Sequence, residues 1–162
     1  MRTLILLSML LTMAGCGGDL KKVFGSDQAI ATINNASTVQ AYRLPPKSYY
    51  KKTIDEFTMS AGPVDVKKES SNELRGILLD SSIYGWDFAK GCMPDYGVRV
   101  HFASGADKVD VMFCFGCDIL TVYHNGKPVG GEDFDDARPR LVRAVKTWFP
   151  DDEAIQELSV SK

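Results

Sequence analysis

The centre of the sequence holds two short runs in which apolar residues occupy every second position. The first run covers 98–102, the second covers 109–113, and Ser-Gly-Ala-Asp at 104–107 lies between them. A period of two places the apolar side chains of a strand on one face, and the glycine and aspartate between the runs favour a turn. The pattern therefore predicts an antiparallel hairpin in which Val98 lies opposite Phe113 and one face of both strands is buried.

Shorter signals on either side add strands to this hairpin. Asn125-Gly126 is the residue pair that a two-residue hairpin turn favours, because both positions adopt positive φ. Further strands are expected at 38–44, at 63–66, at 119–123 and in a short return that begins at Val129. Since most strands follow one another directly along the chain, the sheet is expected to be antiparallel.

Three segments have the apolar spacing of helices. Ser70 and Glu73 fit a capping box in front of a helix over 71–80. A longer helix is expected to begin at Asp135-Asp136, and a last short helix is expected to follow Asp151-Asp152. Together these elements predict an α+β fold, with an antiparallel sheet of about four to five strands and two to three helices packed on it.

Composition restricts the class of protein. The chain has 162 residues, of which 44% are apolar and 25% are charged, and its net charge is -2. These values are close to the average for soluble globular proteins and suit one domain. A dense basic surface is absent from the sequence, so nucleic acid is not an expected partner.

The first residues have the order of a secretory signal peptide. Arg2 supplies a positive charge, Leu4–Met13 form an apolar run, and Ala14-Gly15 are the small residues that precede a cleavage site. The apolar run has about ten residues, whereas a membrane-spanning helix needs roughly twenty. The segment therefore predicts export of the chain. One interpretation is an ordinary signal peptide that happens to have a cysteine near its cleavage site.

Met13-Ala14-Gly15-Cys16 resembles the lipobox of bacterial lipoproteins, which is commonly Leu-Ala-Gly-Cys. The resemblance covers residues 1–16, and Met13 departs from the commoner leucine. It implies cleavage before Cys16, a diacylglycerol thioether on the Cys16 sulfur and an acylated amino group. We expect no cofactor in this protein apart from this covalent lipid on Cys16. It implies a membrane-anchored protein on the extracytoplasmic side of the bacterial cell envelope, and the lack of Asp after Cys16 permits transfer to an outer membrane.

This interpretation divides the chain into three parts. Residues 1–15 are the lipoprotein signal peptide. Residues 16–36 hold the lipidated cysteine, a flexible Gly17-Gly18 tether and a short helix. Residues 37–162 are expected to form a single α+β domain.

The other three cysteines, Cys92, Cys114 and Cys117, allow several arrangements. A redox Cys-x-x-Cys motif requires a helix N-terminus, whereas the residues on both sides of this motif are typical of strands. A metal site would use all three thiols with His124, or alternatively His101, as the fourth ligand. It would need a turn at Phe115-Gly116 to bring both motif sulfurs to one face.

A structural disulfide is favoured in an oxidising compartment. Extending the hairpin register past Val98 puts Cys92 opposite Ile119, diagonally beside Cys117, with the Cys92 side chain toward the core. The register therefore predicts a disulfide between Cys92 and Cys117, a free Cys114 and no bound metal. A disulfide between Cys92 and Cys114 is the alternative.

The sequence shows no recognisable catalytic set. The hairpin register places His101 opposite Asp110, which predicts a cross-strand polar pair. No Gly-x-Ser-x-Gly motif supplies a nucleophile for that pair. We therefore expect a lipid-anchored envelope protein whose non-catalytic domain binds an unidentified envelope protein or glycan, or has a structural role. The alternative is an envelope protein that uses Cys92, Cys114 and Cys117 for thiol redox chemistry or metal binding.

Overall fold

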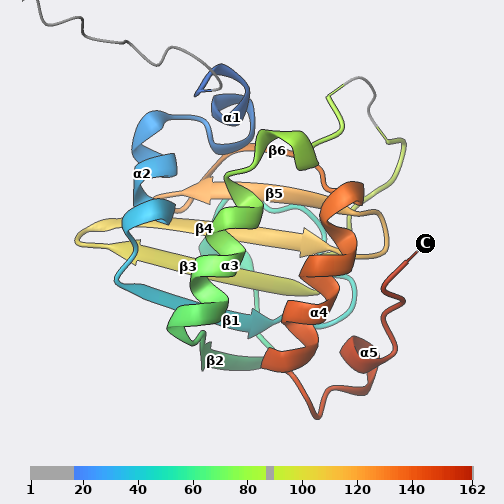
Figure 1. Ribbon diagram of the computed structural model, residues 1–162. Helices are drawn as coiled ribbons and strands as arrows, with labels where there is room; N and C mark the ends of the chain where they lie inside the picture. The colour runs from blue at the N-terminus through green and yellow to red at the C-terminus, as the bar shows by residue number, and fades with distance from the viewer. Residues whose placement is uncertain (1–16, 87–89, 162) are drawn as a thin grey trace, which may run out of the picture.

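A computed structural model describes residues 17–86 and 90–161 (Figure 1). Six strands form one antiparallel sheet in the order β2-β1-β3-β4-β5-β6, which confirms the α+β prediction with more strands than expected. The strands are β1 (Thr38–Arg43), β2 (Ala61–Asp65), β3 (Val98–Ser104), β4 (Asp107–Cys114), β5 (Ile119–His124) and β6 (Lys127–Asp133). The α-helices are α1 (Gly17–Phe24), α2 (Asp27–Asn35), α3 (Lys68–Leu78), α4 (Arg138–Trp148) and α5 (Glu153–Gln156). Within the described residues, no helix has the length and hydropathy needed to cross a membrane.

The central hairpin has the predicted register. Val98 pairs with Phe113 and His101 with Asp110 along β3 and β4. The alternate apolar residues of both strands are buried on the face that the helices cover. Asn125 and Gly126 turn the chain from β5 into β6 with φ of 49° and 84°, as the turn prediction requires.

Helices α1 to α4 cover one face of the sheet (Figure 1). The expectation that residues 16–36 lie outside the domain is wrong for the described part of that segment, because Val23, Phe24 and Ile33 are fully buried in the main core. Gly17-Gly18, expected as a tether, begin α1. A Cβ atom at Gly130 of β6 would overlap backbone oxygens of α1, so the glycine permits the helix to lie directly on this edge strand.

The helix starts differ in part from the prediction. Helix α3 begins at Lys68 with Lys67 as its N-cap and without a side-chain cap, so the expected capping box at Ser70 is wrong. A capping box is instead present at Thr53 and Glu56, where it starts a single 3-10 turn (Ile54–Glu56). Asp152 caps α5 as expected, accepting a hydrogen bond from the Ile155 amide at 3.0 Å.

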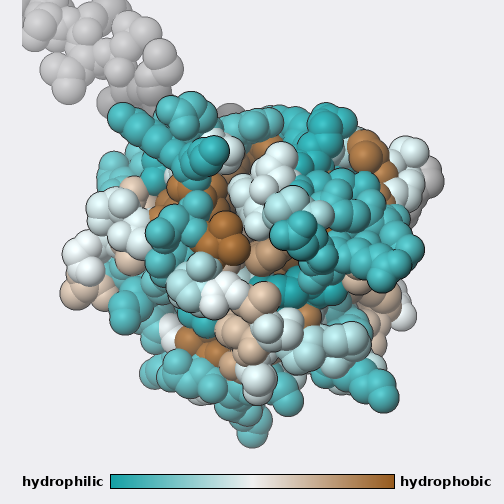
Figure 2. All heavy atoms as spheres, turned by 90° about the horizontal axis from the view of Figure 1, so that it is seen from below, coloured by the Kyte–Doolittle hydropathy of each residue, from teal (hydrophilic) through white to brown (hydrophobic). Residues whose placement is uncertain are grey.

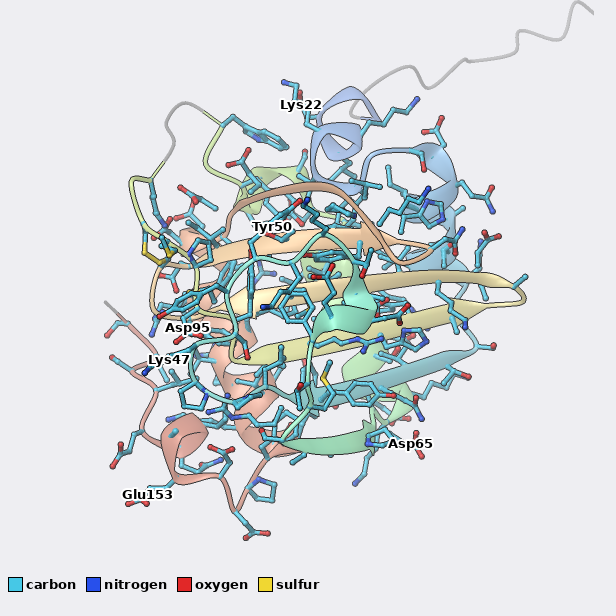
Figure 3. The ribbon with its side chains drawn as sticks, turned by 180° about the vertical axis from the view of Figure 1, so that it is seen from behind. Lys22, Lys47, Tyr50, Asp65, Asp95 and Glu153 are labelled. Atoms are coloured by element: carbon cyan, nitrogen blue, oxygen red, sulfur yellow. A yellow bond between two sulfur atoms is a disulfide. The ribbon has the colours of Figure 1, made fainter. Side chains whose placement is uncertain are left out.

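The second face of the sheet is covered by the long connection between β1 and β2 (Figure 3). This connection contributes Leu44, Ile54 and Phe57 to a second apolar cluster. The phenyl ring of Phe57 makes edge contacts with Tyr96 and Tyr123 of that cluster. The sheet is therefore buried on both faces, by helices on one and by a loop on the other.

Candidate functional site

The Cys-x-x-Cys segment forms the connection between β4 and β5. Cys114 is the last residue of β4 and pairs with Ile119, so residues 115–118 reverse the chain. The reversal places the side chains of Cys114 and Cys117 together in the second apolar cluster, whereas Phe113 lies in the main core. This is the turn that both sulfurs need in order to share one face.

Arg138 of α4 holds the turn in place. Its Nη1 donates a hydrogen bond to the Phe115 carbonyl at 2.6 Å and forms an ion pair with the Asp118 carboxylate. Asp118 is fully buried and has a φ of 55°. Arg138 also donates from Nε and Nη2 to the Ser159 carbonyl, at 3.1 and 2.9 Å. One buried guanidinium therefore joins the turn, the start of α4 and the C-terminal segment.

A disulfide joins Cys92 to Cys117 across 25 residues, with a Cα–Cα distance of 6.2 Å, and Cys114 is a free, buried thiol. The pairing is the one that the hairpin register predicts, but the predicted position of Cys92 is wrong. Cys92 is exposed rather than directed to the core, because 91–97 is not part of β3 and contains Pro94. The disulfide therefore joins an exposed cysteine to a buried one.

A cavity of about 460 Å³ opens beside the disulfide. We call it the cysteine cavity. Its walls come from four segments: the start of the β1–β2 connection, residues 92–97, the turn after β4, and α5 together with Leu158. Its apolar and sulfur-containing lining residues are Pro45, Pro46, Cys92, Met93, Tyr96, Cys114, Phe115, Cys117, Ala154, Ile155 and Leu158. Cavities of this size with mostly apolar walls are typical of small-molecule sites.

The charged residues at the cavity are already engaged with the protein. Arg43 donates from Nη1 to the carbonyls of Leu44 and Gly97, both at 2.7 Å, and its Nε pairs with Asp152 at 2.8 Å. Asp95 accepts hydrogen bonds from the backbone amides of Lys47 and Ser48, at 3.0 and 2.8 Å. Figure 3 shows Lys47 and Asp95 together on this side of the molecule. These groups shape the cavity, and the surface left for a ligand is apolar.

Tyr96 is the one phenol of the lining. Its hydroxyl lies 2.6 Å from Oγ1 of Thr121, and burial raises the pKa of the phenol above its ordinary value. The raised pKa keeps Tyr96 in its neutral form, so the phenol adds no charge to the cavity.

The alternative metal set of Cys92, Cys114, Cys117 and His124 does not come together. Cys92 and Cys117 are bonded to each other. Cys114 pairs with the first residue of β5, whereas His124 is its last, so the two lie about 16 Å apart along the strand. Residues 17–86 and 90–161 contain no group of three or more His, Cys, Asp or Glu side chains placed to bind a metal ion.

His101 and Asp110 form the predicted cross-strand pair, with Nδ1 of His101 at 2.7 Å from Oδ1 of Asp110. Arg99, which the hairpin register did not identify, is a third member and donates to the same oxygen at 2.8 Å. Arg99 also lies two positions before His101 on the same face of β3, which is the signal that would have identified it. The pair is thus part of a buried charge cluster around Asp110, which is 2% exposed.

Cys16, the predicted lipidation site, lies outside the described residues. The chain matches no protein-family model, and neither the curated proteins nor the solved structures include one that is significantly similar to it.

Proposed function

We propose that this chain is a lipid-anchored protein of the bacterial cell envelope whose domain binds an apolar group of another envelope component. The cysteine cavity carries the proposal for the domain: it is large enough for a small ligand, its charged residues are held by the protein, and its free surface is apolar. The lipobox-like sequence that ends at Cys16 supports the anchor. The proposed role is binding, without catalysis.

Replacement of Ala154 tests the binding role. Ala154 is an exposed residue of α5 that lines the cavity, so Ala154→Trp would fill it with a ring. We expect the neutral apolar dye N-phenyl-1-naphthylamine to gain fluorescence on the native domain and to bind Ala154→Trp about tenfold more weakly, a loss of about 1.4 kcal/mol. The matched control is Ala31→Trp, at an exposed position of α2. Equal dye binding by all three proteins would contradict a ligand site in this cavity.

Metabolic labelling tests the anchor. Cells that express the full chain and are fed an alkyne fatty acid should yield a labelled protein in the membrane fraction, and Cys16→Ser should abolish the label. Stable anchoring requires two or more acyl chains, each buried methylene contributing about 0.8 kcal/mol. Cys92→Ser is the control, because it removes a cysteine without touching the lipobox. A label that persists in Cys16→Ser, or that never appears in the native chain, would show the anchor proposal to be wrong.

Thiol–disulfide exchange is a second candidate function, favoured by the turn that puts Cys114 and Cys117 in one cluster beside an exposed Cys92. In the exchange, the Cys114 thiolate attacks the Cys117 sulfur, a Cys114–Cys117 bond forms, and the Cys92–Cys117 bond breaks. The electron pair leaves on Cys92, which takes up a proton.

Trapping of Cys92 separates this candidate from a purely structural disulfide. Incubation of the native domain with iodoacetamide at neutral pH, followed by non-reducing peptide mapping, should give alkylated Cys92 and a Cys114–Cys117 disulfide if exchange occurs. An intact Cys92–Cys117 disulfide after prolonged incubation would contradict it.

A further inference from the structure

We infer that the domain sits directly on the membrane with α1 and the β6 edge of the sheet facing the lipid headgroups. The inference rests on the proposed lipidation of Cys16 and adds an orientation to it. It concerns the surface formed by α1, β6 and Gly85-Trp86, which we call the α1 edge.

The length of chain between the anchor and the core is the first observation. Leu20 is in the main core, at 9% exposure, and it follows Cys16 by four residues. A fully extended chain of four residues spans about 14 Å at most. A lipid on Cys16 would therefore hold the α1 edge within that distance of the bilayer. A flexible tether of the kind expected from Gly17-Gly18 is too short to separate domain and membrane.

The attachment of α1 to the sheet is the second observation. Val23 and Phe24 are fully buried, Gly130 lets the helix backbone lie on β6, and Gly25 ends the helix with a φ of 77°. The Gly25 amide donates to the Lys21 carbonyl at 2.8 Å, which closes the last turn. Because α1 packs in the core, an anchor at Cys16 would hold the whole domain. It would restrict the orientation of the domain as well as its distance from the membrane.

The side chains of α1 are the third observation, because they suit contact with lipid headgroups and their lysines are paired with carboxylates. Lys21 pairs with Asp27 at 2.7 Å, and Lys22 pairs with Asp19 at 3.1 Å. The Lys22 ammonium also lies 5.4 Å from the centre of the Trp86 ring. Tryptophan is enriched at membrane interfaces, because one end of its ring system is apolar and the other carries an N–H group. Since both lysines of α1 are paired with carboxylates, the tether rather than attraction of α1 to anionic lipid sets the orientation.

The opposite end of the molecule is expected to face away from the membrane. The C-terminal end of α4 and α5 lie at the far side of the sheet from α1 (Figure 1). That face is predominantly hydrophilic, with small, separate apolar patches (Figure 2). Since α5 lines the cysteine cavity, this orientation leaves the α5 wall of the cavity remote from the bilayer.

The two tryptophans of the chain lie at these two ends and provide the test. The Gly85 amide next to Trp86 donates to the Asp133 carbonyl at the end of β6. Trp148 ends α4, four residues before Asp152, which bonds to Arg43 of β1. Strands β6 and β1 are separated by β5, β4 and β3, which makes four steps and about 19 Å across the sheet.

The experiment uses the full lipoprotein in vesicles of phosphatidylethanolamine and phosphatidylglycerol that contain a lipid with a nitroxide on its headgroup. Trp148→Phe reports on Trp86, and Trp86→Phe reports on Trp148. We expect the nitroxide to quench Trp86 several-fold more strongly than Trp148. A Gly-Ser insert of about twelve residues after Cys16, with a mean length of about 19 Å, is expected to remove most of the Trp86 quenching and to leave Trp148 unchanged. The insert also controls for burial, because each tryptophan keeps its surroundings.

Intact-mass measurement of the same preparation separates the premise from the inference. Two results in a lipid-bearing protein would overturn the orientation and leave the proposed anchor intact. One is equal quenching of the two tryptophans, and the other is Trp86 quenching that the insert does not change. A mature chain without lipid overturns the proposed anchor and the orientation together.

Discussion

Arg138→Met is expected to lower the free energy of unfolding by about 3–5 kcal/mol. The substitution keeps a long apolar side chain in α4 but removes the guanidinium that pairs with Asp118. The Asp118 carboxylate is fully buried, so it would lose its compensating charge while the turn loses the bond to the Phe115 carbonyl. Because whole domains are stable by about 5–15 kcal/mol, this one change removes a large share of the total. Urea denaturation of residues 17–162 measures it.

Two further variants check the cause. Arg143→Met makes the same chemical change at an exposed position of α4 and should stay within about 0.5 kcal/mol of the native domain. Asp118→Asn combined with Arg138→Met removes both charges, and Asn tolerates the φ of 55° at this position. The double variant should therefore be more stable than Arg138→Met alone. A double variant that is less stable would show that the buried ion pair is not the source of the effect.

Cys92→Ser is expected to lower the free energy of unfolding by about 2–5 kcal/mol. The Cys92–Cys117 disulfide closes a loop across 25 residues, and the chain-entropy model assigns about 3 kcal/mol to a loop of this length. Urea denaturation with and without dithiothreitol tests the assignment. Because Cys92 is an exposed residue, we expect the reductant to reach the disulfide, and the reduced native domain should unfold at the same urea concentration as Cys92→Ser.

Cys114→Ala serves as the control for that series. Alanine is used because Cys114 is buried, and a serine hydroxyl without a partner would add its own cost there. This variant should keep the full response to dithiothreitol, with a loss of about 1 kcal/mol or less in its absence. If dithiothreitol destabilised Cys92→Ser as strongly as the native domain, the disulfide between Cys92 and Cys117 would be contradicted.

Local patterns predicted the centre of the fold well. The alternation in 98–102 and 109–113 determined the hairpin register, because shifting it by one residue would turn every apolar side chain to solvent. Asn125-Gly126 located the next turn for a reason equally local. Neither signal depends on any other part of the chain, which is why both could be recognised without the structure.

Contacts between distant segments were less accessible. The two glycines of 17–18 suggested a tether, but α1 is held by its apolar face on a sheet that the sequence alone does not position. Ser70 and Glu73 had the right spacing for a cap, yet the helix starts earlier, at Lys68. The spacing of a capping box is short enough to occur by chance inside a helix, and the decisive contacts of α3 are in the core.

The candidate site was predicted in part. The register indicated Cys92 and Cys117, although the chain before Val98 leaves the strand and turns Cys92 outward. The cysteine cavity itself could not be predicted, because its walls come from four segments that are far apart in the sequence. Arg138 was missed for the same reason, since its partners Phe115, Asp118 and Ser159 are all about twenty residues away.

The strand order β2-β1-β3-β4-β5-β6 also bears on how the chain reaches its folded state. From β3 to β6 each strand pairs with the next one along the chain, so residues 98–133 form a meander whose paired residues are at most 15 positions apart. Strand β1 joins this meander from about sixty residues away, as the pairing of Thr38 with Ala103 shows. Loops of that length are expected to close late, because the chain loses conformational entropy on closure before it gains any contact. The meander is therefore expected to form first, and β1 with β2 is expected to add to its β3 edge afterwards.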